Sequence, residues 1–153
     1  MNIEEYVLGP QLLRKAVAGM TPPQLAARPI PGKWSTHEVV CHVADFEIIY
    51  ADRIKRVIAE DEPTIFGASP DQFTGRLAYD RRDLEEELLL IELTRRHVGR
   101  ILMAMRPEDF QRRGIHSESG PMTLGTLVER ITGHIPLHVR TIAEKRKAMG
   151  LDD

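Results

Sequence analysis

The stretch STHEVVCHVADFEIIYADRIKRVIAE, residues 35–60, predicts a long amphipathic helix and decides the fold class. Ser35 followed three residues later by Glu38 forms a capping box, which marks the start of a helix. Apolar side chains then recur at spacings of three and four, as on one face of a helix. These residues are Val39, Val43, Phe46, Tyr50, Ile54 and Val57.

The same periodicity predicts two further long helices, over residues 83–105 and 123–149. An N-terminal helix over residues 2–19 is expected to break or kink at the Gly9-Pro10 pair, because proline lacks the backbone N–H that a helix interior needs. No segment alternates with period two, so no strand is predicted. The sequence therefore indicates an all-α four-helix bundle.

Two short segments resemble each other, MTPPQLAAR at residues 20–28 and MRPEDFQRR at residues 105–113. Each lies between two predicted long helices, and its proline favours the start of a short helical turn. This similarity indicates two helix pairs related by an approximate two-fold axis.

The connection over residues 61–80 is long for neighbouring helices of a simple up-down bundle. A crossover of this length allows the predicted helices over residues 35–60 and 83–105 to run parallel. The segment could also cover one end of the bundle as a lid, or have no function of its own. Its length does not decide between these alternatives.

Composition predicts a single cytoplasmic domain over residues 1–153. A net charge of −2 and scattered basic residues argue against a nucleic-acid surface. No apolar run approaches the ~20 residues that span a bilayer, and the acidic start lacks the features of a signal peptide. With one cysteine, Cys41, no internal disulfide is possible.

Three histidines occupy positions where the apolar faces would carry Leu or Ile. His134 and His138, in TGHIPLHVRT at residues 132–141, are four positions apart and share one helix face. His42 lies between Val39 and Phe46 on the predicted helix over residues 35–60. Buried imidazoles need polar partners, and a shared divalent ion would satisfy all three. Hydrogen-bonded core histidines are the alternative.

Other residues near these positions have two interpretations each. Asp45, one turn beyond His42, could accept a hydrogen bond from the outer N–H of a ligand, or could be a surface acid. Arg53 and Arg56 could bind an anionic substrate or pair with nearby acids. Pro136 should distort the helix between the paired histidines. The remaining histidines are expected outside the site: His37 in an exposed first turn, His97 on a charged helix side and His116 in a Gly/Ser-rich loop.

The order WSTHEVVCHVADFE (residues 34–47), a long middle, then TLVERITGHIPLHVRTI (residues 126–142) resembles the DinB/YfiT-like superfamily of metal-dependent enzymes. The shared landmarks are the Trp-Ser start, a histidine seven positions after that serine, and the H-x-x-x-H pair. The resemblance implies a four-helix bundle with up-down-down-up topology, often homodimeric. It also implies zinc or nickel bound by His42, His134 and His138, with water in the open positions.

Characterised members of this superfamily include thiol-dependent S-transferases and a mycothiol-dependent isomerase. The resemblance therefore implies a small-molecule substrate and an enzyme that activates a low-molecular-weight thiol, or water, at the ion. No Ser-His-Asp order, P-loop or G-x-G-x-x-G motif is present. The alternative is a non-catalytic dimeric bundle whose histidines bind a ligand or only stabilise the core.

Overall fold

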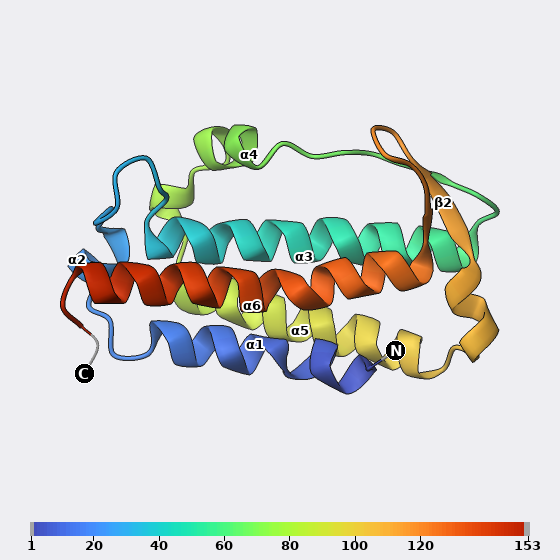
Figure 1. Ribbon diagram of the computed structural model, residues 1–153, viewed down its shortest axis with the longest axis horizontal. Coiled ribbons are helices and arrows are strands. Elements are labelled where there is room, and N and C mark those ends of the chain that lie inside the picture. Colours follow the sequence, from blue (N-terminus) through green and yellow to red (C-terminus); the bar gives the residue numbers. More distant parts are fainter. Residues whose placement is uncertain (1, 152–153) are drawn as a thin grey trace.

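The computed structural model describes residues 2–151, and four long helices lie side by side in it (Figure 1). They are α1 (Ile3–Val17), α3 (Thr36–Ala59), α5 (Leu84–Met103) and α6 (Leu124–Ala148). Helix α1 packs against α5 and α6, and α3 packs against the same two helices. Their facing sides enclose the apolar core. The predicted domain, residues 1–153, extends beyond the described residues at both ends.

The helix starts are where the sequence predicts them. The Ser35 hydroxyl accepts a hydrogen bond from the Glu38 N–H at 3.1 Å, and the Glu38 carboxylate accepts one from the Ser35 N–H at 2.7 Å. At the starts of α5 and α6, the Asp83 and Thr123 side chains accept hydrogen bonds from the Glu86 and Thr126 N–H groups. These bonds satisfy N–H groups that would otherwise lack partners at the first turn.

The two similar segments both form the short helical turns that their prolines favour. The first contains α2 (Pro22–Ala26), and the second contains the 3₁₀ turn η2 (Pro107–Gln111). Turn α2 comes between the long helices α1 and α3, and η2 comes between the long helices α5 and α6.

The prediction that the chain is purely helical was wrong. The structure has a small three-stranded sheet of β1 (Thr64–Ile65), β2 (Arg113–His116) and β3 (Gly120–Thr123). Strand β1 is parallel to β2, and β2 is antiparallel to β3. Strands of two to four residues are too short to show a period-two pattern in the sequence.

Of the break or kink expected at the Gly9-Pro10 pair, the break was wrong, because α1 continues through both residues. Pro10 cannot donate to the Tyr6 carbonyl oxygen, as a residue four positions on would normally do. Instead, the Arg95 Nη1 donates to that oxygen at 2.9 Å. A Cβ atom on Gly9 would lie 2.3 Å from Arg95 Nη1. Glycine therefore leaves the space in which a guanidinium replaces the missing N–H.

Arg95 and Glu47 form an ion pair in the centre of the bundle, with both side chains at 0% exposure. The Arg95 Nε and Nη2 donate to Glu47 Oε1 at 3.0 and 2.7 Å, and Nη2 also donates to the Ile131 carbonyl oxygen. Burial raises the pKa of the Glu47 carboxyl, whereas the Arg95 charge opposes that rise. This single guanidinium is bonded to α1, α3 and α6 from its position on α5.

The crossover between α3 and α5 contains β1, the short helix α4 (Pro70–Arg76) and the 3₁₀ turn η1 (Tyr79–Arg81). Figure 1 shows it passing along α3, which α4 contacts. The Phe73 ring of α4 lies 5.9 Å from the Phe46 ring of α3. No helix within residues 2–151 combines the length and the apolar character needed to cross a membrane.

We predict that Arg95→Met lowers the free energy of unfolding by about 3–5 kcal/mol, because it leaves the buried Glu47 carboxylate without its partner. The adjacent Arg96, which is exposed, provides the control, and Arg96→Met should change stability by less than about 0.5 kcal/mol. Denaturant titration of both variants checks this. Equal stability of the two variants would contradict the assignment.

Candidate metal centre

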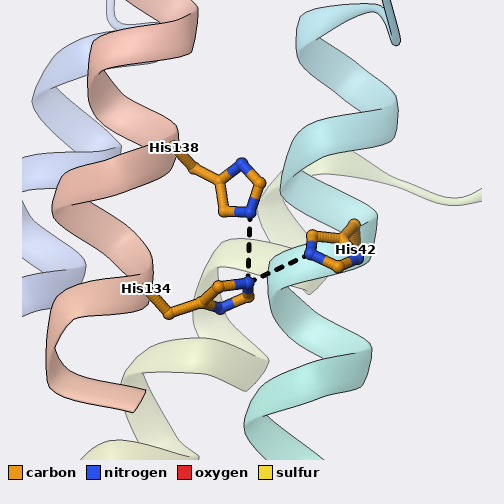
Figure 2. A group of neighbouring side chains, drawn as sticks. All are labelled: His42, His134 and His138. Carbon is orange, nitrogen blue, oxygen red and sulfur yellow. Dashed lines mark hydrogen bonds between the residues drawn. The ribbon is translucent and has the colours of Figure 1, made fainter. Parts of the chain in front are cut away.

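The three histidines that the sequence singled out meet between α3 and α6. Figure 2 shows His42 reaching from α3 towards His134 and His138 on α6. The His134 Nε2 lies 3.0 Å from the His42 Nε2 and 3.1 Å from the His138 Nε2. One ring nitrogen from each residue lies within 4.8 Å of the other two, so the cluster could hold a metal ion.

Pro136 does not separate the two histidines of α6. The helix is continuous from Leu124 to Ala148 with Pro136 inside it. Because side chains four residues apart project from the same face, the two imidazoles still approach each other across the proline. The expected distortion therefore leaves their Nε2 atoms facing one point.

Hydrogen bonds among the three rings cannot satisfy all of their Nε2 atoms. A neutral imidazole nitrogen carries either one proton or one lone pair, so His134 Nε2 cannot make two good hydrogen bonds. An ion at the common point would instead accept a lone pair from each Nε2. Tetrahedral ligands at 2.0–2.1 Å from zinc lie about 3.3 Å apart, close to the observed 3.0 and 3.1 Å. The donor set fits a divalent cation.

The outer nitrogens of the three rings lack partners within the protein. The Nδ1 atoms of His42, His134 and His138 are buried and have no hydrogen-bond partner. With the lone pair on Nε2, each Nδ1 would carry the proton. Metal-ligating histidines usually donate this proton to a carboxylate, a carbonyl or water, and no protein group fills that role here among residues 2–151.

Aromatic side chains orient the rings in place of such bonds. The His42 ring lies 4.5 Å from the Phe46 ring and 5.0 Å from the Trp34 ring, between centroids. Phe46 also reaches the His134 ring at 6.0 Å, and Phe73 of α4 packs behind it. The crossover thus covers part of the cluster.

Burial keeps the three imidazoles neutral. It lowers the pKa of His42 to about 4 and that of His138 to about 4. The pKa of His134 falls to about 2, through burial first and then through the charges of His138, His42 and Arg95. At neutral pH, all three rings therefore carry a free lone pair, and protons do not compete for it.

Asp45 lies near the cluster but makes its hydrogen bonds elsewhere. Its carboxylate accepts from the Tyr79 hydroxyl at 2.7 Å and from Arg82 Nη1 at 3.0 Å. It acts on His42 through its charge, which favours the protonated ring. A role for Asp45 as acceptor from a ligand's outer N–H stays a prediction.

Arg53 and Arg56 make contacts of their own. Arg53 Nη2 donates to the Phe66 carbonyl oxygen while its buried Nε lacks a hydrogen-bond partner, and Arg56 pairs with Asp52 and Glu60. Cys41 is fully buried, and burial raises the pKa of its thiol to about 12. A protonated thiol is a poor metal ligand.

The remaining histidines lie away from the cluster, with two differences from expectation. His37 is half-buried, and its Nε2 lies 2.9 Å from the Tyr79 carbonyl oxygen. His116 ends strand β2 and is 8% exposed, where its Nδ1 accepts hydrogen bonds from the Glu118 and Ser119 N–H groups. His97 is exposed on α5, as its charged neighbours predict.

A hollow of about 270 Å³ lies beside the cluster, with His138 as the one cluster residue in its lining. His138 is part of its wall, together with Trp34, Asp71 of α4 and Lys145 of α6. Lys145 was not among the predicted site residues. Its position seven residues beyond His138 places it on the same helix face, and that spacing could have identified it.

We predict that protein freed of metal loses stability as the pH falls below 6.5, the ordinary pKa of histidine. The folded-state pKa values lie below that of the unfolded chain, so the unfolded chain binds protons first. Each histidine should lower the free energy of unfolding by about 1.4 kcal/mol per pH unit until its folded pKa is reached. Denaturant titration between pH 7.5 and about pH 4.5 measures this slope.

The triple variant His42→Gln, His134→Gln, His138→Gln should reduce the slope, whereas His97→Gln at an exposed position should leave it unchanged. An identical slope in the wild type and the triple variant would show that the cluster does not titrate as described.

Comparison with known proteins identifies relatives over almost the whole chain. The family model of the DinB superfamily matches residues 5–142. A protein of Oceanobacillus iheyensis named "putative metal-dependent hydrolase" is 28% identical over 140 residues, which cover 90% of this chain and 81% of that protein. A protein of the same name from Geobacillus thermodenitrificans is 31% identical over 155 aligned residues, 97% of this chain and 86% of that protein.

Among solved structures, YfiT from Bacillus subtilis matches with a TM-score of 0.92 at 24% identity, over 98% of this chain and 86% of YfiT. YfiT is described as a probable metal-dependent hydrolase with an unusual four-helix bundle topology. At this identity the match establishes the four-helix-bundle fold. With the family match over residues 5–142, the chain belongs to the DinB superfamily.

Proposed function

We propose that this protein is a metal-dependent enzyme whose divalent ion is held by His42, His134 and His138. The observation that carries the proposal is the convergence of three neutral Nε2 atoms on one point. The names of the curated relatives, metal-dependent hydrolases, support it independently. An all-imidazole donor set suits zinc or nickel.

Three protein ligands leave coordination positions open, as in catalytic sites and unlike closed structural ones. When bound, the ion would lower the pKa of a coordinated water or thiol and so supply a nucleophile near neutral pH. The protein's own groups hold the ion, exclude bulk water and admit a small molecule. Trp34 and Phe46 shield His42, and the hollow beside His138 provides the entry.

The nucleophile distinguishes two reaction classes. Water would make the enzyme a hydrolase, as the relatives' names suggest. A low-molecular-weight thiol as cosubstrate would make it an S-transferase, as the sequence resemblance implies. We propose that one of these two small molecules is activated at the ion, and that the substrate is also a small molecule.

We predict that untagged protein binds one divalent ion per chain and that His134→Ala weakens the binding by at least about tenfold, because one ligand is lost. Removal of the ion by a chelator should lower the melting temperature. At free metal about 1,000-fold above the dissociation constant, the loss is about 4 kcal/mol, or roughly 10 °C for a chain of this size. Elemental analysis and thermal melts measure both effects.

His97→Ala, at an exposed histidine on α5, is the matched control and should bind metal as the wild type does. A metal content that is the same in the His134→Ala variant and the control would overturn the assignment of the ligands. Turnover of ester or amide substrates with and without added thiol then separates the two reaction classes. A fully loaded protein without any turnover would favour the non-catalytic bundle.

We also infer an up-down-down-up topology, a homodimer and a cytoplasmic location. The colour order in Figure 1 supports the topology, because α3 and α5 run one way and α1 and α6 run the other. Exposed leucines on the neighbouring helices α1 and α5 support a dimer through that face. They are Leu8, Leu12, Leu89 and Leu93, each 44–49% exposed.

We predict that Leu12→Glu combined with Leu93→Glu converts a dimer into a monomer, because charges would then be buried at the interface. Sedimentation velocity measures the change in mass. Leu77→Glu is the control, since Leu77 is 43% exposed but lies after α4. Dissociation by the control alone would place the interface elsewhere.

A further inference from the structure

Lys145 is a buried cation in the hollow beside the metal ligands. Its side chain projects from the last turn of α6, and the residue is only 3% exposed. It forms part of the wall of the same 270 Å³ hollow as His138. Its charge acts on His138, where it disfavours the protonated ring. A positive charge therefore lies within electrostatic range of the proposed ion.

The ammonium group of Lys145 is poorly satisfied by the protein. Its Nζ donates to the carbonyl oxygen of Thr141 at 3.1 Å, and Thr141 also lines the hollow. No carboxylate within residues 2–151 forms an ion pair with it. An ammonium has three N–H donors, so its charge and two of its donors remain open to a ligand.

The other charges around the hollow are exposed. Asp71, Glu144 and Lys33 line its rim, where water screens them. Glu144 favours the charged form of Lys145, and Lys33 disfavours it. These two effects oppose each other, and Lys145 is the one buried charge among the described residues of the lining, where water screens it least. The hollow therefore favours an anion.

A purely structural role does not account for this burial. Cations stabilise the end of a helix, but Arg146 and Lys147 already occupy the last turn of α6. Long lysine side chains at such positions normally extend their ammonium into water. The Lys145 ammonium is instead buried without a carboxylate partner. This burial destabilises the protein when no ligand is bound in the hollow.

We propose that the hollow binds the carboxylate group of a small acidic substrate or cosubstrate, with Lys145 as the residue that binds the carboxylate. The reacting end of the same molecule then faces the point where the three histidine Nε2 atoms meet. The inference deepens the proposed function, on which it rests. It assigns the substrate to the class of small carboxylic acids and Lys145 to a specificity-determining role.

A pair of matched thiols tests the proposal on cobalt(II)-loaded protein. The two thiols, 3-mercaptopropionate and 3-mercaptopropanamide, differ mainly in charge, and the absorption band between cobalt and sulfur reports binding of either. The wild type should bind the carboxylate at least about tenfold more tightly than the amide, because a hydrogen bond to a charged group discriminates by this much. Lys145→Met should abolish that preference and leave the affinity for the amide unchanged.

Lys147→Met, an exposed lysine on the same helix, is the control and should keep the preference. Lys145→Gln keeps a polar side chain and should lose the preference as Lys145→Met does, so a folding defect in one variant does not decide the result. Equal affinity for both thiols in the wild type would overturn the proposal. A preference for 3-mercaptopropionate that persists in both Lys145 variants would also overturn the proposal.

A second arm separates this inference from the proposed metal site. If cobalt does not bind, the proposed function fails, and if cobalt binds but neither thiol produces the band, its S-transferase form fails. Thermal melts of metal-free protein with propionate or propanamide then decide the carboxylate site alone. A rise in melting temperature with propionate only, absent in the Lys145 variants, supports the site. No rise in the wild type overturns it.

Discussion

The buried guanidinium of Arg95 connects all four long helices, and the position of the site depends on it. From α5 it bonds to Glu47 of α3 and to the carbonyl oxygens of Tyr6 in α1 and Ile131 in α6. In a low-dielectric interior, a charge tolerates few arrangements of its partners. Apolar packing alone would allow the helices to slide more freely past one another. The guanidinium therefore fixes the relative heights of the helices.

This constraint aligns the two halves of the histidine cluster. Glu47 follows His42 by five residues in α3, and Ile131 precedes His134 by three in α6. Because Glu47 and the Ile131 carbonyl oxygen both bond to the Arg95 guanidinium, His42 is held opposite His134. The Arg95 charge also disfavours protonation of His134, so the same group helps to keep that ring neutral. Structural and electrostatic roles coincide in one side chain.

Much of the fold and of the candidate site could be predicted from local patterns. Helix caps such as Ser35 and the histidines on apolar faces depend on spacing within one helix, and spacing is visible in the sequence. The continuity of α1 through Pro10 was not predictable, because it depends on Arg95, 89 positions from Tyr6. Arg95 itself follows Ile91 by four residues on an apolar face, a signal that was available.

The short strands and Lys145 were missed for different reasons. Strands β1 to β3 are held by pairing between distant segments, and two to four residues give no periodic signal. Lys145 belongs to a cluster of three basic residues at the end of α6, and such clusters usually face water. Its low exposure and its place in the wall of the hollow distinguish it from Arg146 and Lys147. Burial within a charged run is a tertiary property.

The crossover helix α4 places side chains at the site without contributing any buried residue to the core. Asp71 lines the hollow, and Phe73 packs behind the ring of Phe46. Because α4 buries no residue, substitutions at exposed positions such as Asp71 can change the wall of the hollow with little effect on the core. Related proteins can diversify in the molecules they accept by changing α4 and keeping the bundle. The hollow is therefore lined both by bundle residues such as Lys145 and by a segment outside the core, and the second part can change with less effect on packing.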